Sequence, residues 1–206
     1  MPDRPSRADA WALLTEFTDN SSLIKHALAV EAAMRAYARR FGENEEEFAA
    51  IGLIHDFDYQ QNQTVETHLH VGTAILRERG WPEDWVRAVA SHADYMGVPR
   101  DTLAAKTLFA VDELTGFLTA CALVRPDRSV AEVQAASVKK KLKDKAFARS
   151  VNREDIVRGA EELGVDLAAH IEVVRDAMAA IADRLELPPQ GQAPGAESQG
   201  SGPGLS

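Results

Sequence analysis

A histidine and an aspartate stand side by side at the end of an apolar run, residues 48–56. Imidazole nitrogens and carboxylate oxygens are ligand types that hard or borderline divalent metals accept. Adjacent residues of a helix point about 100° apart, but at the last turn the second residue can bend back toward a shared ion. His55 and Asp56 are therefore a candidate metal pair, and its weight depends on whether other ligands occur elsewhere in the chain.

Two further residues stand at positions where a metal ligand is one explanation. His26 lies in register with Val30, Ala33 and Tyr37, on or beside the core-facing stripe of a predicted helix. Taken alone, a histidine on such a stripe is more often a core or edge residue than a ligand. Asp112 has apolar residues on most sides, and a buried carboxylate is costly unless it is paired or coordinated. A helix cap or a salt bridge is the alternative for Asp112.

The segments that carry these residues are all predicted to be helices. Helices are predicted at about residues 21–41, 45–56, 65–79, 81–94, 101–123 and 152–185, the last in two segments, with a short lysine-rich helix starting at 129. Ser21 or Ser22, Asn44, Asp101, Asn152 and Asp166 offer N-caps. Gly42 suits the end of the first helix. No alternating run of β-branched residues competes, so the sequence predicts an all-α fold in a single domain of residues 1–187.

Composition narrows the classes of function. Lys and Arg total 23 against 32 Asp and Glu, which gives a formal net charge of -9. No binding to a nucleic-acid polymer is expected, because it requires a basic face. Cys121 is the only cysteine, so disulfides and thiolate clusters within the chain are excluded, and a buried helical position is expected for it.

The two ends of the chain and its hydropathy set further expectations. No apolar stretch is long enough for a signal core or a membrane span, so a cytoplasmic protein without membrane association is expected. Residues 188–206 are almost wholly Pro, Gly, Gln, Ser and Ala, which predicts a disordered tail. The sequence gives no indication of the oligomeric state.

The order His26, His55-Asp56 and Asp112 on successive helices resembles the HD superfamily of metal-dependent phosphohydrolases, over about residues 20–120. Residues 67–76 resemble the family's His-x-x-x-Gly-Ala-x-Ile-Leu helix, and residues 88–94 its segment with another extra histidine. Residues 112–117 and 137–147 resemble a subgroup of small stand-alone prokaryotic HD proteins. The resemblance implies an HD-type helical bundle with additional C-terminal helices.

The same resemblance implies a ligand set. His26, His55, Asp56 and Asp112 would bind the first divalent metal. His68 and His92 would complete a second site, with Asp56 as the bridging carboxylate; in a protein with one metal they would contact the substrate instead. His68 matches the pattern better than His70, which points about 200° away on a helix. The metal could be Mn, Mg, Fe, Co, Ni or Zn.

Other residues near these motifs have two interpretations. Lys139, Lys140 and Lys143, with two further lysines, form a basic patch that is either a solvated helix face or a clamp for substrate phosphate. Asp58 is either a loop cap or a residue that orients a ligating histidine. Sequence features of the cyclic-dinucleotide hydrolases are absent. Residues that select the substrate are expected on the loops at 59–64 and 94–100, and His170 is expected to be structural or exposed.

The leading functional hypothesis is hydrolysis of a small phosphate ester, such as a nucleotide, by a metal-activated water, with Asp56 and Asp112 as catalytic residues. An HD-fold di-iron oxygenase is the first alternative, because four histidines and two aspartates suit either chemistry. A non-catalytic, metal-stabilised binding or regulatory module is the second. The substrate would be a small phosphorylated molecule in the first case.

Overall fold

The computed structural model describes residues 4–187, and within this range the chain is all-α, as the sequence predicted. It contains ten α-helices, one short 3-10 helix and no strand in the part described. The helices are α1 (Arg7–Phe17), α2 (Ser21–Phe41), α3 (Glu45–Ile54), α4 (His70–Glu78), α5 (Glu83–Ser91), η1 (Asp94–Met96), α6 (Leu103–Leu123), α7 (Ala135–Leu142), α8 (Arg153–Leu163), α9 (Leu167–Ala179) and α10 (Ala182–Leu185). The predicted disordered tail, residues 188–206, lies outside the described residues.

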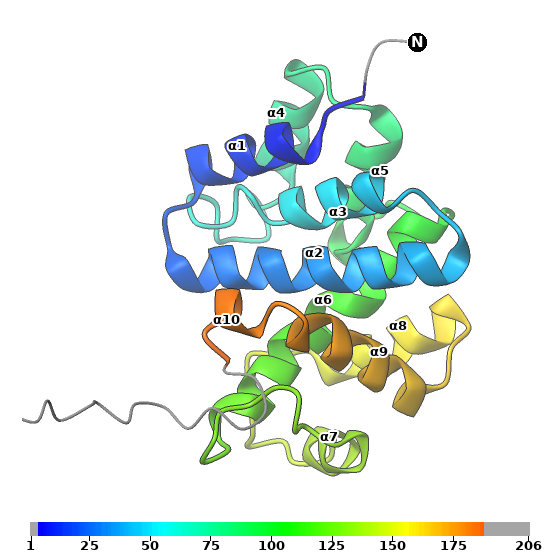
Figure 1. The fold of residues 1–206 in the computed structure, drawn as a ribbon. Helices are drawn as coiled ribbons and strands as arrows, with labels where there is room; N and C mark the ends of the chain where they lie inside the picture. Colours follow the sequence, from blue (N-terminus) through cyan, green and yellow to red (C-terminus); the bar gives the residue numbers. More distant parts are fainter. Residues whose placement is uncertain (1–3, 188–206) are drawn as a thin grey trace, which may run out of the picture.

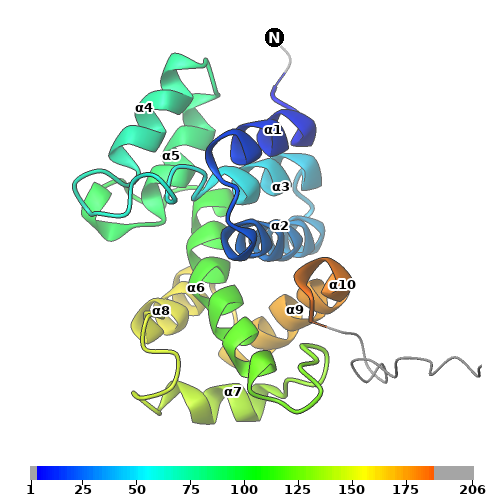
Figure 2. The same cartoon turned by 90° about the vertical axis from the view of Figure 1, so that its left-hand side faces the viewer.

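Helix α6 runs through the middle of the molecule (Figure 2), and the other elements pack around it. Helices α1, α2 and α3 form a stack on one side, α4 and α5 lie beside the upper part of α6, and α7 to α10 surround its lower part (Figures 1 and 2). Apart from its N-terminal end, α6 is apolar on most of its surface, which is the pattern of a helix buried on all sides.

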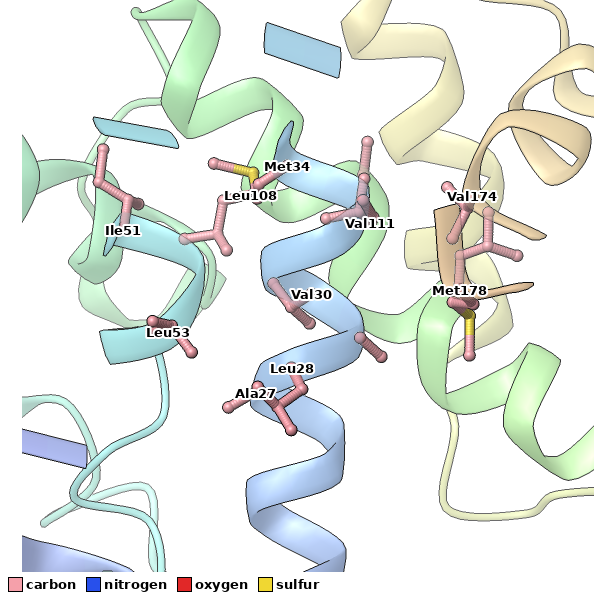
Figure 3. Packing of buried hydrophobic residues seen from close by; sticks show 14 of the residues in the cluster. Ala27, Leu28, Val30, Met34, Ile51, Leu53, Leu108, Val111, Val174 and Met178 are labelled. Carbon is pink, nitrogen blue, oxygen red and sulfur yellow. The ribbon is translucent and has the colours of Figure 1, made fainter. Parts of the chain in front are cut away.

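The core is one continuous cluster of buried apolar side chains. Figure 3 shows its centre, where Val30 and Met34 of α2 lie between residues of α3, α6 and α9. Val111 of α6 and Met178 of α9 are fully buried in the same cluster. Close packing of this kind fixes the relative positions of α2 and α6, the two helices that carry His26 and Asp112.

The helix boundaries follow local capping chemistry, with some differences from prediction. Asn44, Asn152 and Asp166 cap their helices through side-chain oxygens, as predicted. The cap of α2 is Asn20 and that of α6 is Thr102, so the predictions of Ser21 or Ser22 and of Asp101 were wrong by one or two residues. Serine and aspartate are also common N-cap residues, so residue type alone does not distinguish these neighbouring positions.

Three helices differ more strongly from the sequence-based prediction. Helix α1 was not predicted, although Ser6 and Asp9 form a capping box at its start. Helix α4 begins at His70 rather than Val65, since residues 65–69 form turns and Leu69 has a φ of 62°. Helix α7 begins at Ala135 rather than Ser129, because residues 129–134 form a bend and a turn within irregular structure.

Helix α8 packs on α6 through a very close backbone contact. A Cβ atom placed on Gly159 would lie 2.6 Å from Cα of Ala110. Only glycine permits this approach. It brings the beginning of α8 next to the part of α6 that carries Asp112.

Candidate metal centre

Six side chains that the sequence proposed as metal ligands come together in two adjacent groups of three. One group is His26, His55 and Asp112, and the other is Asp56, His68 and His92. In each group the nitrogen and oxygen atoms that could bind an ion lie within 4.8 Å of one another.

The ligands come from several different elements of the fold. His26 lies on α2 and Asp112 on α6, and their Nε2 and Oδ1 atoms are 3.0 Å apart. His55 and His92 stand at the C-terminal ends of α3 and α5. His68 comes from the turn before α4. Packing of four helices and one turn is therefore needed to assemble the centre.

Asp56 lies between the two groups. Its Oδ1 is 3.2 Å from Nε2 of His68 and 3.3 Å from Nε2 of His92, while its Oδ2 is 3.5 Å from Nε2 of His55. This is the position that a carboxylate shared by two ions would need. His55 also lies 3.4 Å from Oδ1 of Asp112.

Two observations indicate that these side chains are suited to binding divalent metals. Oδ1 of Asp56 is buried and has no hydrogen-bond partner among the described residues, which is costly for a carboxylate that holds no ion. Nδ1 of His55 donates to the carbonyl of Gly52 at 2.8 Å, and Nδ1 of His92 to that of Val89 at 2.7 Å. These bonds place the lone pair of both rings on Nε2, facing the centre.

Charge and burial shift the titration of these groups. Burial opposes ionisation of His55, but the charges of Asp56 and Asp112 outweigh it and raise the imidazole pKa well above its ordinary value. Burial also opposes ionisation of the two aspartates, yet His55 and the neighbouring imidazoles hold the pKa of both carboxyls well below the usual range. Both aspartates are thus ionised, the form that binds metals.

Asp58 contacts the second group of ligands (Asp56, His68 and His92) through His68. It is fully buried, and its Oδ2 accepts the backbone N–H groups of Leu69 and Gly72 at 3.2 Å each. Its Oδ1 lies 3.2 Å from Nδ1 of His68, within ion-pair distance but without hydrogen-bond alignment. Burial lowers the pKa of His68, but Asp56 and Asp58 on its two sides raise it to about 9. Of the two interpretations for Asp58, the structure favours the orienting one.

A cavity of about 570 Å³ opens over the centre. Apart from the metal-centre side chains, its lining comes from the turn after α3, η1, α6 and the start of α8: Tyr59, Ala93, Asp94, Tyr95, Phe109, Glu113, Gly116, Asn152 and Asp155. Tyr59, Asp94 and Tyr95 lie on the loops where substrate-selecting residues were expected. Asn152 and Asp155 were not anticipated, because only the packing of α8 on α6 brings them to the cavity.

The predicted lysine clamp is in a different place. Lys139, Lys140 and Lys143 line a separate cavity of about 900 Å³ between α7 and α8, and none of them lines the cavity over the metal centre. The expectation that they lie near the metals rested on the resemblance of residues 137–147 to the small stand-alone HD proteins. In the fold, however, α7 lies at the end of α6 remote from α4 and α5 (Figure 2).

The other histidines have distinct surroundings. His70 is exposed, beside the ring of Tyr95, so His68 is the histidine that the fold brings to the centre. His170 is completely buried and is structural: Tyr37 lies 2.6 Å from its Nδ1, and its Nε2 donates to the carbonyl of Ala110 at 2.9 Å. Cys121 is buried and free, as expected.

Comparison with known proteins gives one finding. Residues 23–116 match the family model described as the HD domain, a segment that contains all six residues of the two groups. No significant match was found among curated proteins or among solved structures. No helix in residues 4–187 combines the length and apolar character required to cross a bilayer.

Proposed function

The chain belongs to the HD-domain superfamily through residues 23–116, and from this premise we propose that it is a metal-dependent phosphohydrolase acting on a small phosphate ester. The observation that carries the proposal is the pair of adjacent three-residue groups under one cavity, with Asp56 between them. Such an arrangement is suited to holding two ions and a phosphoryl group together.

We propose a specific division of the ligands. His26, His55 and Asp112 would hold one divalent metal, and His68 and His92 a second, with Asp56 contributing to both. When bound, the metals acidify a coordinated water and neutralise charge on the phosphoryl oxygens. Asp112, kept ionised by its two histidines, would accept a hydrogen bond from the attacking water and orient it toward phosphorus. The Nδ1–H bonds of His55 and His92 keep their rings fixed during the reaction.

The test is phosphatase activity on a panel of phosphate esters, including nucleotides, with Mn, Mg, Fe, Co or Ni. Asp56→Ala removes the shared carboxylate and should lower kcat/KM by about 1,000-fold or more, a loss of about 4 kcal/mol in transition-state stabilisation. Asp176→Ala is the matched control, because Asp176 is exposed on α9 and pairs only with its neighbour Arg175. Equal activity of wild type and Asp56→Ala would exclude the mechanism.

The same ligand set, four histidines and two aspartates, also suits a di-iron oxygenase, and the experiment separates the two. Metal analysis of aerobically purified protein showing about two iron atoms per chain, together with no phosphatase activity, would favour the oxygenase. Metal binding without either activity would favour a binding or regulatory module.

A further inference from the structure

Apart from the metal-centre side chains, the wall of the cavity over the metal centre combines apolar residues, Ala93 and Phe109, with side chains that carry oxygen atoms. Tyr59 and Tyr95 present phenol groups, Asn152 an amide, and Glu113 and Asp155 carboxylates. No Lys or Arg side chain of residues 4–187 lines this cavity, and the remaining residues of the chain contain neither type. This wall therefore offers a substrate carboxyl groups and neutral polar groups, and it lacks the cationic surface that a polyphosphate needs.

The guanidinium groups that pair with lining residues of the cavity are already engaged. Arg100 and Arg158 stack on the ring of Phe109, at 3.8 Å and 4.8 Å from its centroid. Arg100 pairs with Asp94 at 2.9 Å and with Glu162 at 2.7 Å. Arg158 pairs with Asp94 and with Asp155, at 2.5 Å and 2.6 Å. Three carboxylates share two arginines, so this network has no positive charge left for a substrate.

Glu113 is the carboxylate on the wall without a cationic partner among residues 4–187. Its Oε2 accepts the backbone N–H of Asn152 at 3.1 Å, and no Lys, Arg or His lies within ion-pair distance of it in the described part of the chain. It is one residue along α6 from Asp112, on the same cavity. A group bound beside the metal centre would therefore come within reach of Glu113.

The charges of the centre match one phosphate group. Two divalent metals bring four positive charges, of which Asp56 and Asp112 offset two, and the dianion of a phosphate monoester offsets the rest. A second phosphate group would have no positive charge to meet. Burial and the charge of Asp112 raise the pKa of Glu113 to about 7, so a cation bound beside Glu113 would stabilise its carboxylate, whereas a second phosphate group would be repelled by it.

We infer that the substrate is the phosphate monoester of a small amino alcohol, whose ammonium group binds at Glu113 while its phosphate lies on the metal centre. This inference rests on the proposed function and adds its substrate class. Glu113 is then the specificity-determining residue, and Tyr59 and Tyr95 line the same cavity. Nucleoside diphosphates and triphosphates are excluded as preferred substrates.

The first experiment uses three esters of the same size that differ in the charge of one group: 2-aminoethyl phosphate, 2-hydroxyethyl phosphate and phosphoglycolate. With the Mn-loaded enzyme, kcat/KM should fall in that order, by about tenfold from each ester to the next. Equal values for the three esters, or the highest value for phosphoglycolate or for ADP, would overturn the inference and leave the phosphohydrolase proposal standing.

Charge reversal at one position tests the role of Glu113. Glu113→Lys should lower kcat/KM for 2-aminoethyl phosphate by about 100-fold and should make phosphoglycolate the preferred ester. Glu161→Lys is the matched control: it makes the same charge change on the face of α8 that lines the other cavity, and its order of preference should be that of wild type. An unchanged order in Glu113→Lys would show that Glu113 does not select the substrate.

A binding measurement keeps the test independent of turnover. The phosphonates 3-aminopropylphosphonate and 3-phosphonopropionate have the shape of the first and third esters but cannot be hydrolysed at the bridging position. Calorimetric titration of the Mn-loaded protein should give a Kd about tenfold lower for the amine. If no ester is hydrolysed but this order of Kd is found, the proposed function fails and the ligand class stands. The reverse order would overturn the ligand class itself.

Discussion

At the scale of single residues, the most informative contact is that of Asp58 with His68. Asp58 holds the backbone of Leu69 and Gly72 with one oxygen and faces Nδ1 of His68 with the other. Gly72 is required there, because a Cβ atom would lie 2.7 Å from the Asp58 carboxyl group. The sequence showed that His68, four residues before Gly72, fitted a family pattern, while this contact gives the physical reason for the spacing.

Asp58→Asn should weaken the second metal site while leaving the fold intact. An amide keeps the volume but replaces one acceptor oxygen by an NH2 group, which must face either the imidazole or two backbone N–H groups. We expect Mn affinity of the weaker site to fall about 10–100-fold, measured by calorimetric titration of metal-free protein. Asp19→Asn is the control, since Asp19 is exposed and its side chain contacts only Gln60. Unchanged affinity in Asp58→Asn would leave Asp58 with a loop-capping role alone.

At the scale of elements, the existence of most helices could be predicted from apolar periodicity and caps, whereas the starts of α4 and α7 could not. The predicted helical pattern extends back to Val65, yet Leu69 has a positive φ of 62°, which a helix cannot continue through, and its N–H donates to Asp58. This bond joins residues eleven apart in the sequence, so no local pattern shows it. Tertiary contacts of this kind override local propensity.

The contact of α8 with α6 gives a prediction at this scale. In Gly159→Ala the new Cβ would meet the backbone of Ala110 at 2.6 Å, and a helix backbone cannot move aside as a side chain can. We expect a loss of about 1–3 kcal/mol in the free energy of unfolding, measured with urea, and a displacement of Asn152 and Asp155 from the cavity.

Gly116→Ala is the matched control within α6. A Cβ there would meet no atom within 4 Å, and alanine favours a helix interior over glycine by about 1 kcal/mol. The control variant should therefore be more stable than wild type. Equal stability of the two variants would show that α8 does not pack on α6 as closely as described.

At the scale of the whole molecule, the sequence predicted which residues meet but not the surface around them. His26, His55, Asp56, His68, His92 and Asp112 were all proposed from motifs, and the fold brings them together. The carboxyl groups on the cavity wall and the remote position of the three lysines depend on how α7 and α8 pack along α6. This long-range packing produces no periodic pattern in the sequence. That wall, rather than the metal ligands, decides which substrate class is proposed.

The buried His170 gives a prediction for the stability of the whole molecule, because it joins α9 to α2 and α6. Burial lowers the pKa of its imidazole to about 4, while the unfolded chain has a value near 6.5. Burial also raises the pKa of Tyr37 to about 12, so the phenol stays protonated and donates to Nδ1 of His170. Between about pH 6.5 and pH 4 the unfolded state therefore binds a proton that the folded state does not, and stability falls as the pH is lowered through this range.

The full effect on the free energy of unfolding is about 3 kcal/mol, since each unit of pKa difference contributes about 1.4 kcal/mol. His170→Gln keeps a donor and an acceptor but cannot titrate, so its stability relative to wild type should rise steadily as the pH falls from about 7 to about 4.5. Urea unfolding at several pH values measures this difference, from which the titrations shared by both proteins cancel. The same substitution at the exposed His70 is the control. If the difference in unfolding free energy between His170→Gln and wild type did not change with pH, His170 would titrate in the folded state as it does in the unfolded chain. Helix α9 would then not bury His170 against α2 and α6.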